Sequence, residues 1–327
     1  MELQQSFSDY YGSIEPINKT ENETISEHKG NYYIHHAIFS FHYNKTAISI
    51  TSNPYGKVLL ETCTFYNNSS TEDGGSFYIL HPDCVLVHIC LLLSKGKKTG
   101  CGYYIWSVQT TYKKSYAFEC SFTECSGYRG SFYHYYGDIQ VSNINTSFHK
   151  ITCYAAYAIS DPTGTGIIKF TTASNTSSTH YAVTFNNKCN VTKCNYLNND
   201  YTGSDNGIIY SYRNSTNFSS CSFIGNKGNY LFDVKPNIVD NCYFNENNVT
   251  QTVRNDPISY DSNDSLDSFI SHYSTEQCPT TNLEKNKKDS NLKFKKGKLK
   301  IKDIKNIVNK SFKTSFIVAV NMSIKKS

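Results

Sequence analysis

A short pattern that recurs along the chain places the strongest constraint on its fold. Residues 63–68 read Cys-Thr-Phe-Tyr-Asn-Asn, and residues 74–78 read Gly-Gly-Ser-Phe-Tyr. In an extended strand Cys63 and Phe65 share one face, since side chains alternate along a strand. Asparagine and glycine both tolerate the backbone angles of a sharp bend. The unit therefore predicts a strand, a polar corner, a glycine corner and a second strand.

Degraded copies of this unit are spread over most of the sequence. A cysteine lies two residues before a large apolar residue six times, at Cys63, Cys90, Cys120, Cys194, Cys221 and Cys242. We take the large apolar residue of each copy as its anchor. The anchors are Phe41, Phe65, Leu92, Phe122, Phe148, Tyr196, Phe223 and Phe244, with Phe170 as a weaker intermediate. Successive anchors are 21 to 30 residues apart, except for the interval of 48 that contains Phe170.

A period of this length, built of short strands and polar corners without a helical stripe, indicates a solenoid. Each copy would form one coil, and its inward cysteine and aromatic residue would stack on those of the next coil. The sequence therefore predicts an all-β solenoid of about nine coils. A β-sandwich is the alternative all-β architecture, but it gives no reason for one signature to recur at this spacing.

The aromatic-x-x-Asn and Gly-Gly-Ser-aromatic pattern resembles the repeat of the chlamydial polymorphic outer membrane proteins. The cysteine two places before the aromatic residue is more similar to the large trichomonad family of related surface proteins. The resemblance covers roughly residues 31–250, although the Cys120 copy has Cys125 in place of asparagine and the Phe148 copy lacks both cysteine and asparagine. It implies a right-handed parallel β-helix at the cell surface, with a role in adhesion or antigenic variation, and it supplies no catalytic residues.

Four segments are predicted. Residues 1–30 form a polar N-terminal extension or cap, residues 31–250 the β-helix, residues 251–284 a C-terminal cap and linker, and residues 285–327 a lysine-rich, disordered tail. The tail holds 14 lysines against two aspartates and is formally +12, so residues 1–284 carry −7 to give the total of +5. Because no arginines interleave these lysines, we expect a solvated tail and no nucleic-acid partner.

Targeting signals do not match the resemblance. Residues 1–30 contain no apolar core of the length that a signal peptide needs, and the apolar run at 315–320 is far shorter than the about 20 residues of a membrane span. Either the protein is cytoplasmic or a segment upstream of Met1 is missing, and we adopt the second expectation. Fourteen Asn-x-Ser/Thr sequons, about twice the number that the composition predicts, favour a glycosylated exterior, and the alternative is that Asn-rich turns flanked by Ser and Thr form sequons by chance.

The twelve cysteines and the histidines do not form a recognisable metal site. The sequence contains no Cys-x-x-Cys, and the inward cysteines are explained as small buried hydrophobic residues. His81, Cys84 and Cys90, and the pairs Cys120/Cys125 and Cys189/Cys194, are the nearest approaches to zinc spacing. His35 and His36 are adjacent, so on a strand they would point to opposite faces and could not bind one metal. We therefore expect no metal and no cofactor.

The acidic residues bear on enzymatic activity, because some β-helix proteins are polysaccharide lyases or glycoside hydrolases. Those reactions need two carboxylates about 5–10 Å apart, which in a β-helix means equivalent positions of adjacent coils. The solenoid acids scatter over the repeat instead: Glu61, Glu72, Asp73, Glu119, Glu124, Asp138, Asp205, Asp233 and Asp240. Arg129 and Arg213 have no matched carboxylates. We therefore expect no catalytic residues.

An aromatic cluster is the best candidate for recognition: Tyr128, Phe132, Tyr133, Tyr135, Tyr136, Tyr154 and Tyr157. Alternate members must face outward, where stacked tyrosines either stabilise the sheet or bind a sugar or a protein. The hypothesis is a non-catalytic, adhesin-like or antigenic surface protein whose partner is a host-cell protein or glycan. A carbohydrate-active enzyme and a decayed family member without present function are the alternatives.

Overall fold

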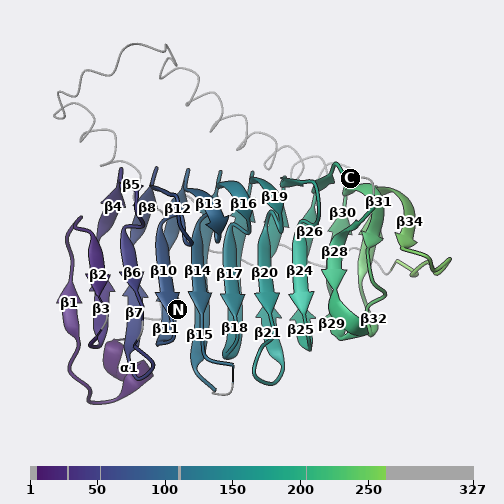
Figure 1. Ribbon diagram of the computed structural model, residues 1–327. Coiled ribbons are helices and arrows are strands. Elements are labelled where there is room, and N and C mark those ends of the chain that lie inside the picture. The colour runs from purple at the N-terminus through teal and green to yellow at the C-terminus, as the bar shows by residue number, and fades with distance from the viewer. Residues whose placement is uncertain (1–5, 28, 52, 110–111, 204, 263–327) are drawn as a thin grey trace, which may run out of the picture. The chain divides into compact units, whose positions relative to one another are not determined.

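The computed structural model describes residues 6–262, except 28, 52, 110–111 and 204, and all of these lie in the first of two units, Met1–Pro279 and Thr280–Ser327. The described residues form a right-handed parallel β-solenoid of about eight turns (Figure 1). The predicted fold is therefore confirmed, and the count of about eight turns differs slightly from the predicted nine. The predicted lysine-rich tail at 285–327 and the end of the predicted cap and linker, 263–284, lie outside the described residues.

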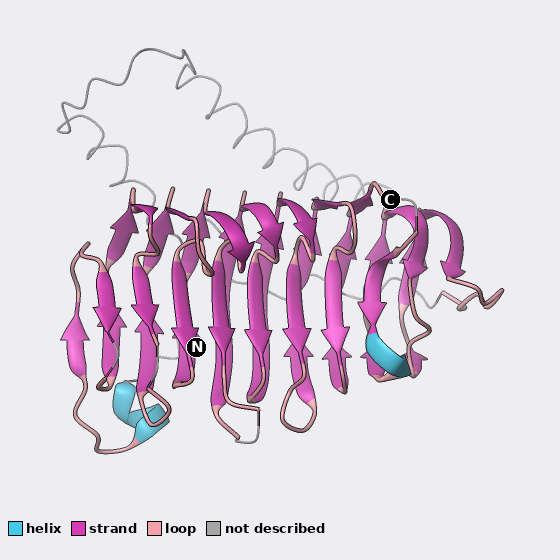
Figure 2. Cartoon of the chain, in the orientation of Figure 1, coloured by secondary structure: helices cyan, strands magenta, loops and turns pink. Residues whose placement is uncertain are grey.

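Each turn contributes short strands to four columns, and every pairing between neighbouring turns is parallel (Figure 2). The first column holds β1 (Ile17–Lys19), β3 (Tyr32–His35), β7 (Lys57–Glu61), β11 (Asp83–Val87), the first halves of β15 (Lys114–Thr123) and β18 (Asp138–Ser147), β21 (Gly166–Lys169), β25 (Cys189–Thr192), β29 (Thr216–Ser219) and β32 (Ile238–Asp240). The second column holds β4 (Ile38–Ser40), β8 (Thr64–Tyr66), β12 (Cys90–Leu92), the second halves of β15 and β18, β22 (Thr172–Ser174), β26 (Asn195–Leu197), β30 (Ser222–Ile224) and β33 (Tyr243–Asn245).

The third and fourth columns complete each turn. The third column holds β5 (Tyr43–Asn44), β9 (Ser69–Ser70), β13 (Lys95–Thr99), β16 (Ser126–Arg129), β19 (Lys150–Cys153), β23 (Ser177–Ser178), β27 (Asp200–Tyr201) and the first halves of β31 (Lys227–Phe232) and β34 (Asn248–Val253). The fourth column holds β2 (Ile25–Glu27), β6 (Ile48–Ile50), β10 (Phe77–Leu80), β14 (Tyr103–Trp106), β17 (Phe132–Tyr135), β20 (Tyr157–Ser160), β24 (Val183–Asn186), β28 (Gly207–Ser211) and the second halves of β31 and β34.

The inward residues of the second column are the true anchors. In register they are Phe39, Phe65, Leu91, Phe122, Thr146, Ala173, Tyr196, Phe223 and Phe244. Five predicted anchors are confirmed, whereas Phe41, Leu92, Phe148 and Phe170 were wrong by one to three positions. Rings of successive turns stack where both are aromatic, as between Phe39 and Phe65 at 5.0 Å and between Phe223 and Phe244 at 4.9 Å.

Two left-handed corners frame every strand of the second column. The residue three places before each anchor has a positive φ: His36, Thr62, His88, Glu119, Asn143, Phe170, Lys193, Ser220 and Asn241. The residue two places after each anchor does too: Phe41, Asn67, Leu93, Glu124, Phe148, Asn175, Asn198, Gly225 and Glu246. The wrong anchors Phe41, Phe148 and Phe170 are thus corner residues, so their side chains do not enter the core.

The ends of the solenoid differ from the predicted boundaries. β1 and β2 pair with β3 and β6, so the stack begins at Ile17 and not at residue 31. The short helix α1 (Phe7–Tyr11) packs against the outer side of the first column, where Phe7 contacts an apolar cluster that includes Leu59 and Val85. At the other end Tyr260 stacks on Phe244 with ring centroids 5.9 Å apart and continues the aromatic column beyond the last strand.

Candidate functional site

An asparagine ladder runs inside the solenoid three residues after the anchors. Asn68, Asn199, Asn226 and Asn247 make the same two contacts with the preceding turn. In Asn226 the amide nitrogen donates to the carbonyl oxygen of Tyr196 at 2.8 Å, and Oδ1 accepts from the Asn199 backbone N–H at 3.1 Å. The sequence predicted that these asparagines form the bend itself, but the residue before each of them adopts the left-handed conformation.

A cysteine row lies beside this ladder, two residues before the anchor. Its members are Cys63, Cys120, Cys194, Cys221 and Cys242, and all are free and buried. Each thiol contacts the carbonyl oxygen two residues earlier, for example Cys120 to Phe118 at 3.1 Å. Thr171 takes the same position and donates to the Lys169 carbonyl at 3.1 Å, whereas Ala37, Ile89 and Ile144 occupy it in the remaining turns without a side-chain donor. Cys90 was wrongly included, because it aligns with Thr64 and not with Cys63.

These thiols are expected to resist alkylation in the folded protein. Burial raises the pKa of Cys63 and of Cys120 to about 12, so almost no thiolate is present at pH 8. Mass spectrometry after brief iodoacetamide treatment should find both unmodified in buffer and fully modified in denaturant. Cys153, which is 6% exposed, is the internal comparison and should react first. Equal labelling of Cys63 with and without denaturant would contradict the buried arrangement.

Two histidines interrupt the apolar interior in neighbouring turns. His134 lies between the Tyr103 hydroxyl at 2.9 Å and the Ser115 hydroxyl at 2.8 Å. His149 occupies the ladder position, where Nδ1 accepts from the Cys125 backbone N–H at 3.0 Å and Nε2 therefore donates to the Thr146 hydroxyl at 2.7 Å. Burial lowers the pKa of each imidazole to about 3, so both are neutral. Nothing in the sequence pattern distinguished either residue.

The residues considered for metal binding are not brought together. No group of three His, Cys, Asp or Glu side chains suited to a metal occurs among the described residues. Cys84, Cys125, Cys189 and Cys194 are free and buried. The prediction for His35 and His36 was wrong in its geometry: His36 has φ 52°, which turns the two rings toward each other and places their Nδ1 atoms 3.1 Å apart.

Most of the scattered carboxylates have individual partners. Glu61 accepts from the Tyr33 hydroxyl and Asp138 from the Tyr116 hydroxyl. Glu119 lies 2.6 Å from His88, Glu72 pairs with Lys98, and Asp233 lies 3.1 Å from Arg254. Arg129 and Arg213 instead lie against the rings of Tyr128 and Tyr212.

The outer surface carries two aromatic groups with different surroundings. On the first column, Tyr33, Tyr116 and Phe118 belong to the apolar cluster that helix α1 covers. On the fourth column a longer row, here called the tyrosine ladder, follows the strands that face the viewer in Figure 1. The ladder comprises Tyr78, Tyr104, Trp106, Tyr133, Tyr135, Tyr136, Tyr154, Tyr181, Tyr210 and Tyr212. Most of its members are half-buried.

Ring stacking holds the ladder together. Tyr78 and Tyr104 stack at 5.4 Å and Tyr104 and Tyr133 at 5.1 Å between centroids. Ala158 and Thr184 take the tyrosine position in the next two turns, and Tyr154 and Tyr181, stacked at 6.0 Å, bridge this gap. Because the rings stack along the solenoid axis, they present their edges and hydroxyl groups to a ligand. Of the predicted cluster, Tyr133, Tyr135, Tyr136 and Tyr154 join the ladder, whereas Phe132 and Tyr157 point into the core.

Polar groups accompany the ladder along its length. Ser160 donates to the Tyr133 hydroxyl at 3.0 Å and accepts from the Asn186 amide at 3.0 Å. Asp161 follows in the same turn, and partial burial raises the pKa of its carboxyl group. Near the C-terminal end the Tyr181 hydroxyl lies 3.4 Å from Asp233. The face thus combines aromatic rings with the partly exposed hydrogen-bonding groups of Asn186 and Asp161, whereas Ser160 and Asp233 are buried.

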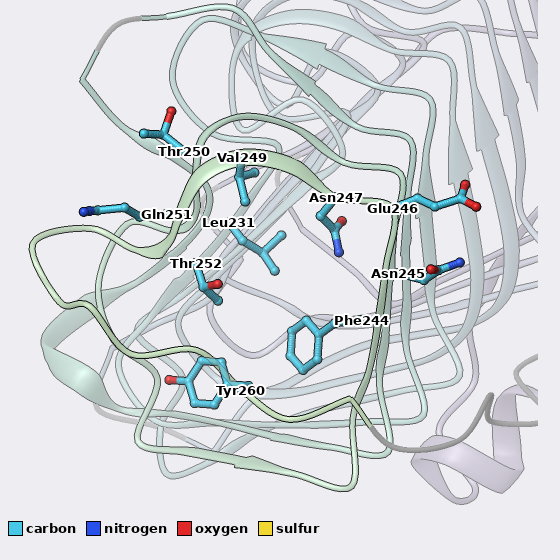
Figure 3. A pocket seen from close by; sticks show the side chains of 10 residues that line it. All are labelled: Leu231, Phe244, Asn245, Glu246, Asn247, Val249, Thr250, Gln251, Thr252 and Tyr260. Atoms are coloured by element: carbon cyan, nitrogen blue, oxygen red, sulfur yellow. The ribbon is translucent and has the colours of Figure 1, made fainter.

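Two cavities lie away from the ladder. One, of about 320 Å³, opens at the last turn, where Leu231, Phe244, Val249 and Tyr260 are among the lining side chains (Figure 3). The other, of about 350 Å³, crosses the outer side of the third column and is lined by lysine, serine and glycine residues.

Most exposed sequons of the described residues lie away from the ladder. Within those residues seven sequon asparagines are exposed: Asn18, Asn22, Asn44, Asn175, Asn190, Asn214 and Asn248. Asn214 is the exception, because it ends the short 3-10 helix η1 (Tyr212–Asn214) that begins at the ladder member Tyr212. Asn68 is fully buried in the asparagine ladder and cannot carry a glycan in the folded protein.

The described residues include no helix with the length and hydrophobicity of a membrane span. Comparisons with protein-family models, with curated proteins and with solved structures found no match to this chain.

Proposed function

We propose that this protein is a non-catalytic binding solenoid whose tyrosine ladder recognises an extended, neutral glycan, in the manner of an adhesin at a cell surface. The observation that carries the proposal is the contrast between the two outer aromatic groups. The group on the first column is covered by α1, whereas no described segment covers the ladder. Aromatic side chains left at a surface together with polar groups are typical of recognition sites.

Spacing and polarity both favour a linear sugar chain. The centroid separations of 5.4 and 5.1 Å along the ladder are close to the repeat of one monosaccharide in an extended β-linked glycan. Tyrosine hydroxyls and the partly exposed Asn186 and Asp161 side chains supply donors and acceptors for sugar hydroxyls. Apart from Asn214, which lies beside Tyr212 at one end of the ladder, the exposed sequons of the described residues lie away from this face, so attached glycans would leave most of it open. The repeat's resemblance to surface-protein families supports a surface location on separate grounds.

Trp106 gives a direct test, because it is the only tryptophan in the chain and belongs to the ladder. Titration with linear neutral oligosaccharides of four to eight units should shift its fluorescence in a saturable way. Tyr136→Ser removes a ring stacked on Tyr135 at 3.9 Å together with the phenolic hydroxyl at its edge, and should weaken binding about tenfold, in line with the loss of one hydrogen bond to a sugar hydroxyl. Tyr55→Ser, at a side chain that is 87% exposed and away from the ladder, is the matched control.

Thermal unfolding of both variants checks that the solenoid remains intact. Absence of a saturable signal with any neutral glycan, or an equal loss of affinity in both variants, would rule out the ladder as a glycan site. Binding of a protein partner that Tyr136→Ser abolishes would replace the glycan by a protein ligand.

A further inference from the structure

A basic groove crosses the outer side of the third column, on a different face from the tyrosine ladder. It spans β5, β9, β13 and β16 and has a volume of about 350 Å³. Lys95 and Lys97 line it together with Ser69, Ser126 and Gly127. In the strand register Ser69, Lys95 and Ser126 occupy equivalent positions of three successive turns. The lysine is therefore flanked along the solenoid axis by two small hydroxyl side chains, which leaves room on both sides of it.

Close packing beneath the groove explains its glycines. A Cβ on Gly127 would lie 2.0 Å from the Gly96 carbonyl oxygen and 2.6 Å from the Cys101 sulfur, and Gly127 has φ +146°. A Cβ on Gly96 would lie 2.7 Å from the Cys101 Cα. Both positions must stay glycine for these turns to approach each other. The groove is thus a rigid feature of the backbone.

The charge in the groove is not balanced by the described residues. Lys95 and Lys97 are exposed and form no ion pair with any described residue, whereas the neighbouring Lys98 pairs with Glu72. Lys150 follows Ser126 in the same register, so a second exposed lysine continues the row one turn further. None of the residues lining the groove is acidic or aromatic.

From this geometry we propose that the groove binds the sulfate or carboxylate groups of a linear anionic polysaccharide. Lysine ammonium groups bind such anions as point charges, and serine hydroxyls and backbone groups complete the contacts to sugar oxygens. A single-stranded nucleic acid fits less well, because binding of that kind uses aromatic rings on which bases stack, and the groove offers none. The site stands on residues separate from the tyrosine ladder, so it does not depend on the glycan proposal above.

Residue-resolved lysine acetylation is the appropriate experiment, because the full chain also contains the lysine-rich segment 285–327. Brief treatment with an acetylating reagent is compared by mass spectrometry with and without dextran sulfate, and with neutral dextran as the uncharged probe. At a ligand concentration of about ten times Kd, the reactivity of Lys95 and Lys97 should fall about tenfold with dextran sulfate and stay unchanged with dextran. Lys188, which is exposed on the solenoid outside the groove, should keep its reactivity.

A matched pair of variants completes the test. In the Lys95→Gln, Lys97→Gln variant, dextran sulfate should no longer protect Lys150, which continues the row, whereas Lys188→Gln with Lys193→Gln changes the net charge equally and should leave that protection in place. Equal protection of Lys95 and Lys188 would show attraction to net charge alone and overturn the site. Equal protection of Lys95 by a single-stranded oligonucleotide would overturn the assignment to a polysaccharide.

Discussion

Replacement of Asn226 by alanine is expected to destabilise the solenoid by about 3 kcal/mol, because it leaves buried polar groups without partners. The Asn199 backbone N–H loses its acceptor at 3.1 Å, the Tyr196 carbonyl oxygen loses a donor at 2.8 Å, and Asn247 loses the amide that lies 2.9 Å from its Oδ1. The Asn199 and Tyr196 groups lie in the interior, where water cannot replace the amide without entering the core, whereas Asn247 is partly exposed at the last turn. Denaturant unfolding of both proteins measures the difference.

Asn175→Gly is the matched control for this variant. Asn175 lies at an exposed left-handed corner of the same column of turns, and glycine accepts its φ of 52° without strain. The change should stay within about 0.5 kcal/mol of the parent protein. A loss below about 1 kcal/mol for Asn226→Ala would show that the asparagine ladder follows from the fold and contributes little to its stability.

Acidification is expected to weaken the fold through His134 and His149. Their folded pKa values are lowered to about 3 by burial, whereas an unfolded histidine has a pKa near 6.5. Between these values the unfolded chain binds protons that the folded chain does not. The contribution to stability is therefore complete above about pH 6.5 and is lost as the pH falls toward 3. At pH 5 each histidine should account for a loss of about 2 kcal/mol in the free energy of unfolding.

His149→Asn isolates this effect from the carboxylates that also titrate. The introduced amide can accept from the Cys125 backbone N–H, as the asparagines do in other turns, and it carries no titrating group. Between pH 7.5 and 5.0 the variant should lose about 2 kcal/mol less than the parent protein. His180→Asn, at an exposed side chain, should lose as much as the parent. An identical pH dependence for the parent and His149→Asn would show that the folded protein protonates His149 above pH 5.

The architecture was predictable because the anchor residues recur at a nearly regular spacing along the sequence. At Phe65, Phe122, Tyr196, Phe223 and Phe244 the inward residue is large and aromatic, and spacing alone located it. The prediction of the anchor was wrong where the inward residue is small or polar, as at Thr146 and Ala173. In these turns the nearest phenylalanine was taken as the anchor, and it is a corner residue. At Leu91 three leucines follow one another, so no alternation of apolar and polar residues distinguishes inward from outward side chains.

The surface was less predictable than the core. Tyr133 and Tyr135 were recognised as outward candidates, but Tyr78, Tyr181 and Tyr210 joined the ladder only once the register of the turns was known. The groove at Lys95 was invisible for the same reason, since its serines come from turns about 26 and 31 residues away in the chain. Sequence locates a residue within its own turn, whereas a binding surface depends on which turns become neighbours.

The left-handed corners have a consequence for engineering. Every turn holds two residues in a conformation that costs an ordinary side chain about 1–2 kcal/mol, and Gly225 is the only glycine among them. Phe148 is a clear example, since its bulky side chain is 42% exposed and its φ is 57°. The stability of the protein can therefore be raised at these corners without repacking its interior. Glycine or asparagine introduced at such corners, one turn after another, offers a stepwise route to a higher Tm.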